Sequence, residues 1–346
     1  MTQDERREYL IHYLLKEEMK FVRQSIPTDK QGQENLLRSL MNVRPPRPIS
    51  NDFLKIQDEY LTERNIERGI TDVDTLAPVK SDLRLYIWQG DITTLKCDAI
   101  VNACNSQMLG CFSPMHACID NFIHTYAGME LRLKMHEIMA KQGHEEETGK
   151  AKITSGYNLP TKYILHTVGP IIQWKVTKED EDLLASCYTE CLKLAADTGV
   201  ESIAFCCLST GVFRFPRQRA AEIATNTVKQ YLNKDSRIKK VIFNVFMMIW
   251  ANVTEDELKE KKEIQTTFGE TLSWDYLCYA RENPIIWEIP THILYGEKDN
   301  LTAYGTIFEF VQRTNSTLSI MKNGEHWFHT DEQMKFLDEW IIKSSK

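Results

Sequence analysis

The chain has 346 residues, a length that predicts two or three folded units rather than one. Apolar residues make up 42% of the chain and charged residues 26%, which is the ordinary balance of a soluble globular protein. The net charge of −7 argues against a general nucleic-acid binder, because such proteins usually carry a basic excess, but it leaves room for a local site that binds one phosphorylated ligand.

Targeting segments are not expected. Residues 1–7 are charged and lack the apolar core of a signal peptide. The most apolar stretch, residues 241–253, is too short to cross a bilayer and is typical of a buried strand. We therefore expect a cytoplasmic protein without membrane or nucleic-acid partners, in which the nine cysteines are thiols or metal ligands rather than disulfides.

Residues 1–75 are predicted to be helical. Apolar residues recur with helical spacing over 10–22 and again over 36–41. The proline-rich segment 44–48 then breaks the pattern, and residues 50–52 are candidate caps of a third helix. This region shows no chemistry of its own, so we expect a helical extension packed on the next domain.

From residue 81 onward, strand-like and helical segments alternate. This alternation predicts an α/β fold with a largely parallel sheet that carries helices on its faces. In such folds ligands usually bind beyond the carboxyl ends of the strands, so the loops there are the candidate site. The expected strands are 83–88, 99–103, 151–154, 163–168, 202–208 and 240–249, and the expected helices are 116–141, 183–196 and 217–232.

Two loops that follow strands carry polar side chains. Asp91 can accept a hydrogen bond from an exocyclic amine such as that of adenine. Asn102 and Asn105 offer donors and acceptors to ribose hydroxyls. Asp and Asn also cap ordinary turns, so a structural role stays open for each of them.

A third loop, Leu208–Pro216, joins a strand to a helix. Ser209, Thr210 and Gly211 allow backbone amides to approach a diphosphate, and the helix N-terminus adds positive potential. An ordinary strand-to-helix turn is the alternative, because one glycine alone does not indicate phosphate binding.

The segment after the second loop contains a possible metal site. Cys111, His116 and Cys118 supply two thiolates and an imidazole, which suit zinc. A structural zinc normally has four protein ligands, whereas a catalytic zinc leaves one position open. Cys104 is a conceivable fourth ligand, but its place near a strand end favours burial. Cysteine and histidine also pack in apolar helices without a metal, which is the alternative interpretation.

Together, these loops resemble the macrodomain family. Gly-Asp-Ile-Thr (90–93), Asp-Ala-Ile-Val-Asn-Ala-x-Asn-Ser (98–106) and Ser-Thr-Gly-Val-Phe (209–213) follow the order of that family. The resemblance implies a three-layer α/β/α sandwich that binds ADP-ribose. It also implies that Asp91 contacts adenine beside the Ile92 backbone, that Phe246 stacks on the adenine, that Ser209, Thr210, Gly211, Val212 and Phe213 hold the diphosphate, and that Asn102 and Asn105 face the distal ribose.

The segment Gln107–Cys118 resembles the zinc-dependent branch of the same family, which has Gln-Met-Leu-Gly-Cys-x4-His-x-Cys there and a similar helical extension over 10–75. The resemblance implies one zinc ion per chain on Cys111, His116 and Cys118, next to the distal ribose and Asn105. It further implies a hydrolase that removes mono-ADP-ribose from a modified protein side chain, with a lipoyl-carrier protein as one candidate target. Asp120 and His124 are then either orienting groups, one and two helical turns beyond His116, or surface residues.

Residues 270–346 resemble the last quarter of an α/β-hydrolase. Asp299 matches the acid of that family's triad and His326 matches its histidine. A serine hydrolase that uses Ser209, Asp299 and His326 is therefore a rival hypothesis. We favour it less, because Cys207–Gly211 lacks the first glycine of a Gly-x-Ser-x-Gly elbow. A non-catalytic ADP-ribose-binding module is a third hypothesis.

The sequence thus predicts three parts. Residues 1–75 form a helical N-terminal extension, residues 76–268 a zinc-containing macrodomain, and residues 269–346 an α/β-hydrolase-like C-terminal segment.

Overall fold

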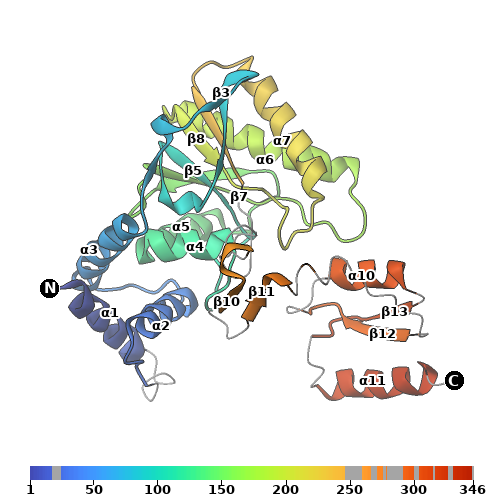
Figure 1. Ribbon diagram of the computed structural model, residues 1–346. Helices are drawn as coiled ribbons and strands as arrows, with labels where there is room; N and C mark the ends of the chain where they lie inside the picture. Colours follow the sequence, from blue (N-terminus) through green and yellow to red (C-terminus); the bar gives the residue numbers. More distant parts are fainter. Residues whose placement is uncertain are drawn as a thin grey trace. The chain divides into compact units, whose positions relative to one another are not determined.

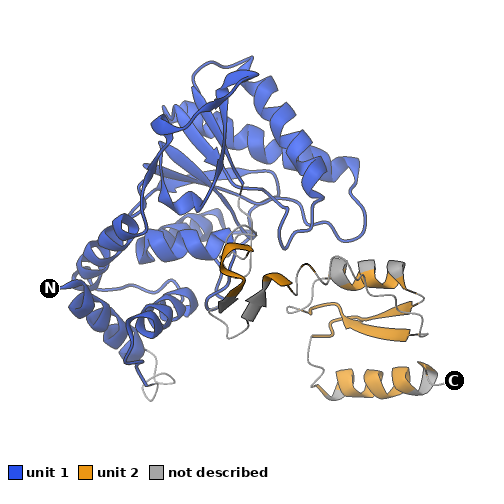
Figure 2. Cartoon of the chain, in the orientation of Figure 1, with its two compact units in different colours: residues 1–248 blue, residues 249–346 orange. Residues whose placement is uncertain are grey.

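The protein is described by a computed structural model. The description covers residues 1–17, 25–245, 259–265, 271–275, 278, 291–299, 304–314, 316–325 and 330–344. The chain divides into two compact units, residues 1–248 and residues 249–346 (Figure 2). The helical extension and the α/β region belong to the same unit, and the finer division at residues 75 and 268 stays a prediction.

Three helices open the first unit, as the sequence predicts. The side chain of Asp29 caps the second helix by accepting from the Gly32 amide, and Ser50 caps the third by accepting from the Phe53 amide. These helices bury an apolar cluster of their own, which includes Met129 of a later helix, so the extension packs on the α/β region. The helices are α1 (Gln3–Glu17), α2 (Lys30–Val43) and α3 (Asn51–Glu67) (Figure 1).

A seven-stranded sheet forms the centre of the first unit, in the order β2-β3-β9-β8-β5-β7-β6. From β3 to β7 all neighbours are parallel, whereas β2 and β6 pair antiparallel at the two edges. The predicted largely parallel sheet is therefore confirmed. The strands are β2 (Pro78–Val79), β3 (Asp82–Gln89), β5 (Ala99–Ala103), β6 (Ala151–Ser155), β7 (Tyr163–Thr167), β8 (Ser202–Phe205) and β9 (Lys240–Val245).

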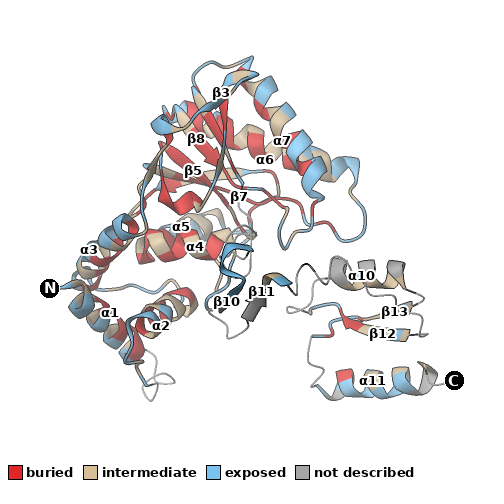
Figure 3. Ribbon diagram, in the orientation of Figure 1, coloured by how far each residue is buried: buried red, intermediate tan, exposed pale blue. Residues whose placement is uncertain are grey.

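Helices cover both faces of this sheet, which gives the three-layer α/β/α arrangement (Figure 1). The strand β5 lies in the interior of the sheet between β8 and β7, and its residues Ala99, Ile100 and Val101 are fully buried. Figure 3 shows the strand coloured as buried. Residues that follow β5 are therefore held by a rigid core. On one face lie α4 (Ile119–Ala127) and α5 (Met129–Gln142), and on the other α6 (Lys178–Asp197) and α7 (Arg217–Leu232).

The predicted single helix 116–141 is wrong at its start and in its middle. The first helix begins only at Ile119, and the two helices are separated by Gly128, whose φ is 103°. A Cβ atom at Gly128 would lie 2.7 Å from Nε2 of Gln57, so the close approach of α3 also requires a glycine. His116 consequently lies in the loop before the helix, and Asp120 is not one helical turn beyond it.

Smaller elements complete the first unit. A two-stranded parallel sheet pairs residues that precede and follow β3. Among the residues that the structure describes, no helix is long and apolar enough to cross a membrane. The elements are β1 (Thr71–Asp72), β4 (Leu95–Lys96) and the 3-10 turns η2 (Val73–Thr75) and η3 (Ile92–Thr94).

The second unit contains two short sheets and two helices among its described residues. Its two-stranded parallel sheet aligns Thr291 with Ser316 and Gly296 with Met321. A separate pair, β10 and β11, is antiparallel. The relation of this unit to α/β-hydrolases stays a prediction. The elements are β10 (Glu263–Gln265), β11 (Thr271–Ser273), β12 (Thr291–Gly296), α10 (Tyr304–Arg313), β13 (Ser316–Met321) and α11 (Asp331–Ser344).

Candidate functional site

The predicted site residues lie at the carboxyl ends of three parallel strands of one sheet, β3, β8 and β5. Asp91 follows β3, the segment from Asn102 to Cys118 covers the end of β5 and the loop after it, and Ser209 follows β8. Because parallel strands end at the same edge of a sheet, the three loops belong to one edge.

Asp91 is held in place from two sides. One carboxylate oxygen accepts from the Thr93 amide at 2.9 Å and so caps η3. The other accepts from Nη2 of Arg68, which lies just beyond α3. The Arg68 guanidinium lies over the Tyr126 ring, 3.4 Å from its centroid. The Asp91 side chain nevertheless keeps 31% of its surface exposed, so a ligand amine can reach it.

Ile92 follows Asp91 in the predicted adenine site. Its side chain is buried, at 1% exposure, within the core of the first unit. The side chain therefore anchors the turn, and only the backbone is left for a ligand contact, as the resemblance implies.

Asn105 closes the loop that leads to the cysteines. Its Oδ1 accepts from the Met108 amide at 3.0 Å, and its Nδ2 donates to the Gly110 carbonyl at 3.2 Å. Its side chain is half-buried. Asn105 thus shapes the loop, and its ribose contact stays a prediction.

Asn102 is fully buried and belongs to a chain of polar side chains. Its Nδ2 donates to Oδ1 of Asp120 at 2.8 Å and lies 3.3 Å from Nδ1 of His166. Nε2 of His166 lies 2.8 Å from the hydroxyl of Thr154. Within the described residues, Oδ1 of Asn102 has no hydrogen-bond partner. This burial does not favour the predicted ribose contact of Asn102, which stays a prediction.

The two titratable members of this chain have shifted pKa values, both because of burial. Burial raises the pKa of the Asp120 carboxyl to about 7 and lowers the pKa of His166 to about 3. His166 is consequently a neutral imidazole at physiological pH.

His124 is buried on α4 beside the same loop. The ring lies so close to Gly110 that a Cβ atom there would meet Cγ of His124 at 2.8 Å. Within the described part of the chain, neither ring nitrogen of His124 has a hydrogen-bond partner, and Nε2 lies 3.6 Å from the Asp120 carboxylate. Both Asp120 and His124 are buried, so the alternative that they are surface residues is wrong.

The loop after β8 presents backbone amides. Ser209 has a left-handed φ of 62°, and its carbonyl accepts from the Phe215 amide at 2.9 Å, which curls the loop. The amides of Gly211, Val212 and Phe213 donate to no acceptor within the described residues, and the first two residues are exposed. Three such amides in sequence can bind an anionic oxygen.

The side chains of this loop differ in accessibility. The Ser209 hydroxyl is buried against Gly169 and has no hydrogen-bond partner among the described residues, and the Thr210 hydroxyl donates to the Cys207 carbonyl at 3.0 Å. The backbone, rather than these hydroxyls, is therefore the part of the loop that is free to contact a ligand.

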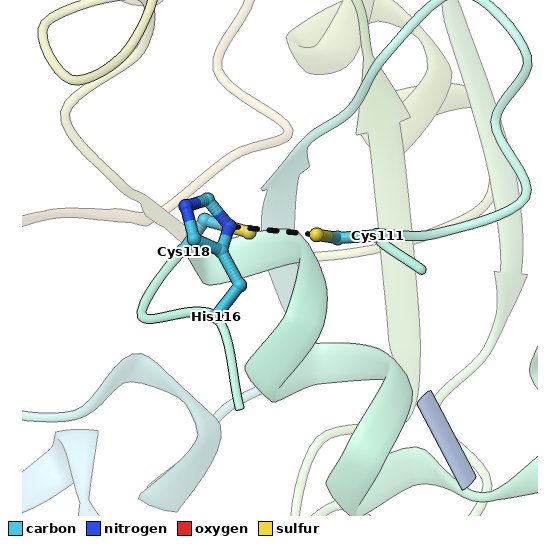
Figure 4. A group of neighbouring side chains, drawn as sticks. All are labelled: Cys111, His116 and Cys118. Carbon is cyan, nitrogen blue, oxygen red and sulfur yellow. Dashed lines mark hydrogen bonds between the residues drawn. The ribbon is translucent and has the colours of Figure 1, made fainter. Parts of the chain in front are cut away.

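The three candidate metal ligands converge in one place (Figure 4). Sγ of Cys111, Sγ of Cys118 and a ring nitrogen of His116 all lie within 4.8 Å of one another. Nδ1 of His116 is 3.4 Å from Sγ of Cys111. Zinc–sulfur and zinc–nitrogen bonds at a tetrahedral angle require about 3.6 Å between such atoms, so the donor set fits a zinc ion. Cys104 is not part of this group, because it is buried beside His166, with its Sγ 3.7 Å from Nδ1.

The two thiols of this group have pKa shifts in opposite directions. The hydrogen bond from Cys118, together with contact to His116, lowers the pKa of Cys111 to about 4, and the same bond raises the pKa of Cys118. The neighbouring Cys111 thiolate raises the pKa of His116. The lowered pKa of Cys111 favours its thiolate, which is the form that binds a metal.

Comparison with known proteins identifies the family. A family model described as "Macro domain" matches residues 101–224. A "Protein-ADP-ribose hydrolase" of Treponema medium is 58% identical over 248 residues, which are 71% of this chain and 95% of the relative. The chain belongs to the macrodomain family.

A second relative and a solved structure are similar to smaller or equal shares of the chain. A "Protein-ADP-ribose hydrolase" of Staphylococcus aureus is 51% identical over 242 residues, covering 70% of this chain and 90% of the relative. The solved macrodomain of Oceanobacillus iheyensis with ADP is 38% identical, with a TM-score of 0.43, and covers 48% of this chain and 84% of that one.

Several site residues of this macrodomain protein were not found from the sequence. Arg68 holds Asp91, whereas Arg38 and Asn121 hold the loop of the metal ligands. The signal that was available is the placement of a polar residue within an apolar helical pattern, as for Asn121 between Ile119 and Phe122.

Two of the predicted residues lie outside the part of the chain that the structure describes. Phe246 follows the last described residue of β9, and His326 follows Glu325, so both lie outside the described residues. Asp299 is described in the second unit, where its amide donates to the Gly296 carbonyl at 3.0 Å. The rival triad with Ser209 stays a prediction.

Proposed function

We propose that this macrodomain protein is a zinc-dependent hydrolase that removes mono-ADP-ribose from a modified protein side chain. The observation that carries the proposal is the convergence of Cys111, His116 and Cys118 in the loop after the buried strand β5. Three protein ligands leave a fourth position open, which is typical of a catalytic zinc. The relatives of Treponema medium and Staphylococcus aureus that are named protein-ADP-ribose hydrolases support the hydrolase part of the proposal.

The nucleotide part is proposed to lie along the neighbouring loops. Asp91 accepts from the adenine amine beside the Ile92 backbone, and Phe246 stacks on the ring. The loop from Ser209 to Phe213 holds the diphosphate, mainly through the amides of Gly211, Val212 and Phe213, and the exposed positions of Gly211 and Val212 support this assignment. The distal ribose is then oriented toward the loop of the metal ligands.

The catalytic side is proposed to use the chain's own residues as follows. Cys111, His116 and Cys118 hold the ion, and Asn105 keeps their loop closed through its bonds to the Met108 amide and the Gly110 carbonyl. When bound, zinc supplies Lewis-acid polarisation and lowers the pKa of water.

A buried pair supports the helix that begins beside the site. Asp120 lies in the first turn of α4, two residues after the N-cap Cys118, and accepts from Asn102. The pair joins the end of β5 to the start of α4 and so fixes the position of Cys118. We propose that Asn102 contributes to ribose binding by positioning Cys118 through Asp120, in addition to any direct contact with the ribose.

The partner is proposed to be a mono-ADP-ribosylated protein, with a lipoyl-carrier protein as the candidate. This part of the proposal is supported by the resemblance of residues 107–118 to the zinc-dependent branch of the family. A panel of modified proteins that includes such a carrier, with the same modified residue type on an unrelated protein, separates recognition of the carrier from recognition of ADP-ribose.

The test is single-turnover release of ADP-ribose from a modified protein. The wild type should release it, whereas Cys111→Ala and His116→Ala should lose both zinc and turnover. Cys278→Ser is a matched control, because Cys278 belongs to the second unit. If the wild type binds ADP-ribose tightly but releases none, the protein is a non-catalytic binding module. Labelling of Ser209 by a fluorophosphonate, together with turnover in Cys111→Ala, would instead favour the serine hydrolase.

A further inference from the structure

The loop that carries the metal ligands is fastened by a buried asparagine. Asn121 is fully buried in the first turn of α4. Its Nδ2 donates to the Ser113 carbonyl at 3.0 Å and to the Cys111 carbonyl at 3.4 Å. Its own amide donates to Sγ of Cys118 at 3.4 Å. One residue therefore contacts the loop at its start, its middle and its end.

Arg38 of α2 in turn fixes this asparagine. Its Nη2 donates to Oδ1 of Asn121 at 2.8 Å and to the His116 carbonyl at 3.0 Å, and its Nε donates to the same Oδ1 at 3.3 Å. The guanidinium also lies 4.3 Å from the centroid of the Phe122 ring. A planar guanidinium can make this set of bonds at once, because its donors are fixed relative to one another.

The helix that carries Arg38, α2, is itself held in place at its C-terminal end. Arg132 of α5 donates to the carbonyls of Met41, Asn42 and Arg44 at the end of α2, at 3.0, 2.8 and 2.7 Å. It also donates to the Leu109 carbonyl at 2.8 Å. These bonds satisfy carbonyls that a helix end leaves without partners, and they tie α2 to the start of the metal loop.

A second contact from α2 lies one turn beyond Arg38. Oδ1 of Asn42 accepts from the Met115 amide at 3.2 Å, and Nδ2 donates to the hydroxyl of Thr125 at 3.0 Å. Met115 directly precedes His116 and has a left-handed φ of 57°. Side chains of α2 thus bind the backbone just before His116, at the Met115 amide, and just after it, at the His116 carbonyl.

The partners of Arg38 are uncharged. Its hydrogen-bond acceptors are a carbonyl and an amide oxygen, and no carboxylate pairs with it in the described ranges. Burial lowers the pKa of Arg38, so the positive charge is kept in the structure at a cost. A hydrophobic side chain would serve packing alone, whereas the guanidinium also supplies the donors to the His116 carbonyl and to Asn121.

We propose that Arg38 is a positioning residue for the metal loop, which acts through Asn121 and the His116 carbonyl to hold the three ligand atoms in the geometry that binds zinc. This inference rests on the zinc site of the proposed function. It assigns the N-terminal helical extension a role in the site, because α2 supplies the contacts although it supplies no ligand.

The experiment measures zinc affinity by competition with a chromophoric chelator, together with the visible spectrum of the cobalt(II)-substituted protein. Arg38→Ala should weaken zinc binding by about 10- to 100-fold, the range usual for partners of metal ligands. It should also change the cobalt ligand-field bands, because these report the coordination geometry. Arg38→Lys should fall between the wild type and Arg38→Ala, since an ammonium keeps the charge but not the forked donors.

Arg6→Ala is the matched control. Arg6 is an arginine of the same helical extension, which joins α1 to Glu59 and Glu63 on α3 through partly exposed ion pairs. This variant should keep the zinc affinity and the cobalt spectrum, because surface ion pairs contribute little to stability. Circular dichroism should show that Arg38→Ala, Arg38→Lys and Arg6→Ala are all folded.

The outcomes separate the inference from the proposed function. A wild type that binds no zinc contradicts the proposed function and the inference together. A wild type that binds zinc, with Arg38→Ala within twofold of its affinity and with the same cobalt spectrum, contradicts only the inference. Equal weakening in Arg38→Ala and Arg6→Ala also contradicts it, because the effect would then be general destabilisation of the extension.

Discussion

Arg68 and Asp91 form an ion pair between the end of the helical extension and the first loop of the sheet. The same guanidinium donates to the hydroxyl of Thr93 at 2.8 Å and lies over the ring of Tyr126. Together with the contacts of Arg38, this pair places the extension at both ends of the candidate site. The extension therefore contributes side-chain contacts to the candidate site in addition to packing against the sheet region.

The first prediction concerns this pair. Asp91→Ala should weaken ADP-ribose binding by about 10- to 100-fold, because it removes a hydrogen bond to a charged acceptor. Arg68→Ala should weaken binding less, because the Asp91 carboxylate keeps its bond from the Thr93 amide. Isothermal titration calorimetry measures both. Arg64→Ala, which breaks ion pairs to Glu34 and Glu67, is the control, and equal losses in all three variants would count against the assignment.

The second prediction concerns Gly110 in the metal loop. Gly110 and Gly143 both have left-handed φ values, of 83° and 78°. A Cβ atom at Gly110 would meet the His124 ring at 2.8 Å, whereas one at Gly143 would meet nothing within 4 Å. Gly143→Ala should therefore cost about 1 kcal/mol from backbone strain alone. Gly110→Ala should cost more and should also weaken zinc binding.

Urea unfolding measures the stability of Gly110→Ala and Gly143→Ala, and chelator competition measures their zinc affinity. Equal unfolding free energies for Gly110→Ala and Gly143→Ala would show that the contact with His124 carries no cost.

The third prediction concerns the pH dependence of stability. Burial lowers the pKa of His166 from 6.5 to about 3. The unfolded chain therefore takes up a proton below about pH 6.5 that the folded protein does not accept. The stabilising contribution of the neutral His166 is present above that pH and is lost as the pH falls toward 3, with a slope of up to about 1.4 kcal/mol per pH unit.

His166→Gln removes this titration and keeps a polar side chain. The free energy of unfolding should be measured by urea at pH 7.5 and pH 5.0. The wild type should lose more stability between the two pH values than the variant does. An identical loss in both proteins would mean that His166 does not titrate as its burial implies.

The fourth prediction concerns chelation. A metal that binds only the folded protein stabilises it by mass action. EDTA should therefore lower the Tm of the wild type, whereas Cys118→Ala should start from a lower Tm and show no further change with EDTA. Differential scanning calorimetry measures both. If EDTA lowers the Tm of Cys118→Ala as much as that of the wild type, the effect comes from another site.

Much of the fold followed from local patterns in the sequence. The cap at Ser50 and the alternation of strands and helices from Asp82 to Val245 depend on neighbouring residues, and they were predicted. The break at Gly128 was not predicted, because a single glycine is tolerated in many helices. Its cause here is the approach of Gln57, which is 71 residues away in the chain.

The metal-ligating residues of the candidate site could be predicted from the sequence, but the residues that position them could not. Cys111, His116 and Cys118 lie close together in sequence, so their spacing was visible. Arg38 and Asn121 are 83 residues apart, and only the packing of α2 on α4 brings them together. The burial of Asn102 was also hidden, because a polar residue at the end of a strand can face either the core or the ligand.

The measurement that tests the central claim most directly is turnover as a function of bound zinc. Metal-free wild-type protein is titrated with zinc, and the release of ADP-ribose from a modified protein is measured in a single turnover at each step. The account predicts no release without zinc and a rise in proportion to bound metal until one equivalent fills the site of Cys111, His116 and Cys118. Full release by the metal-free protein would contradict it.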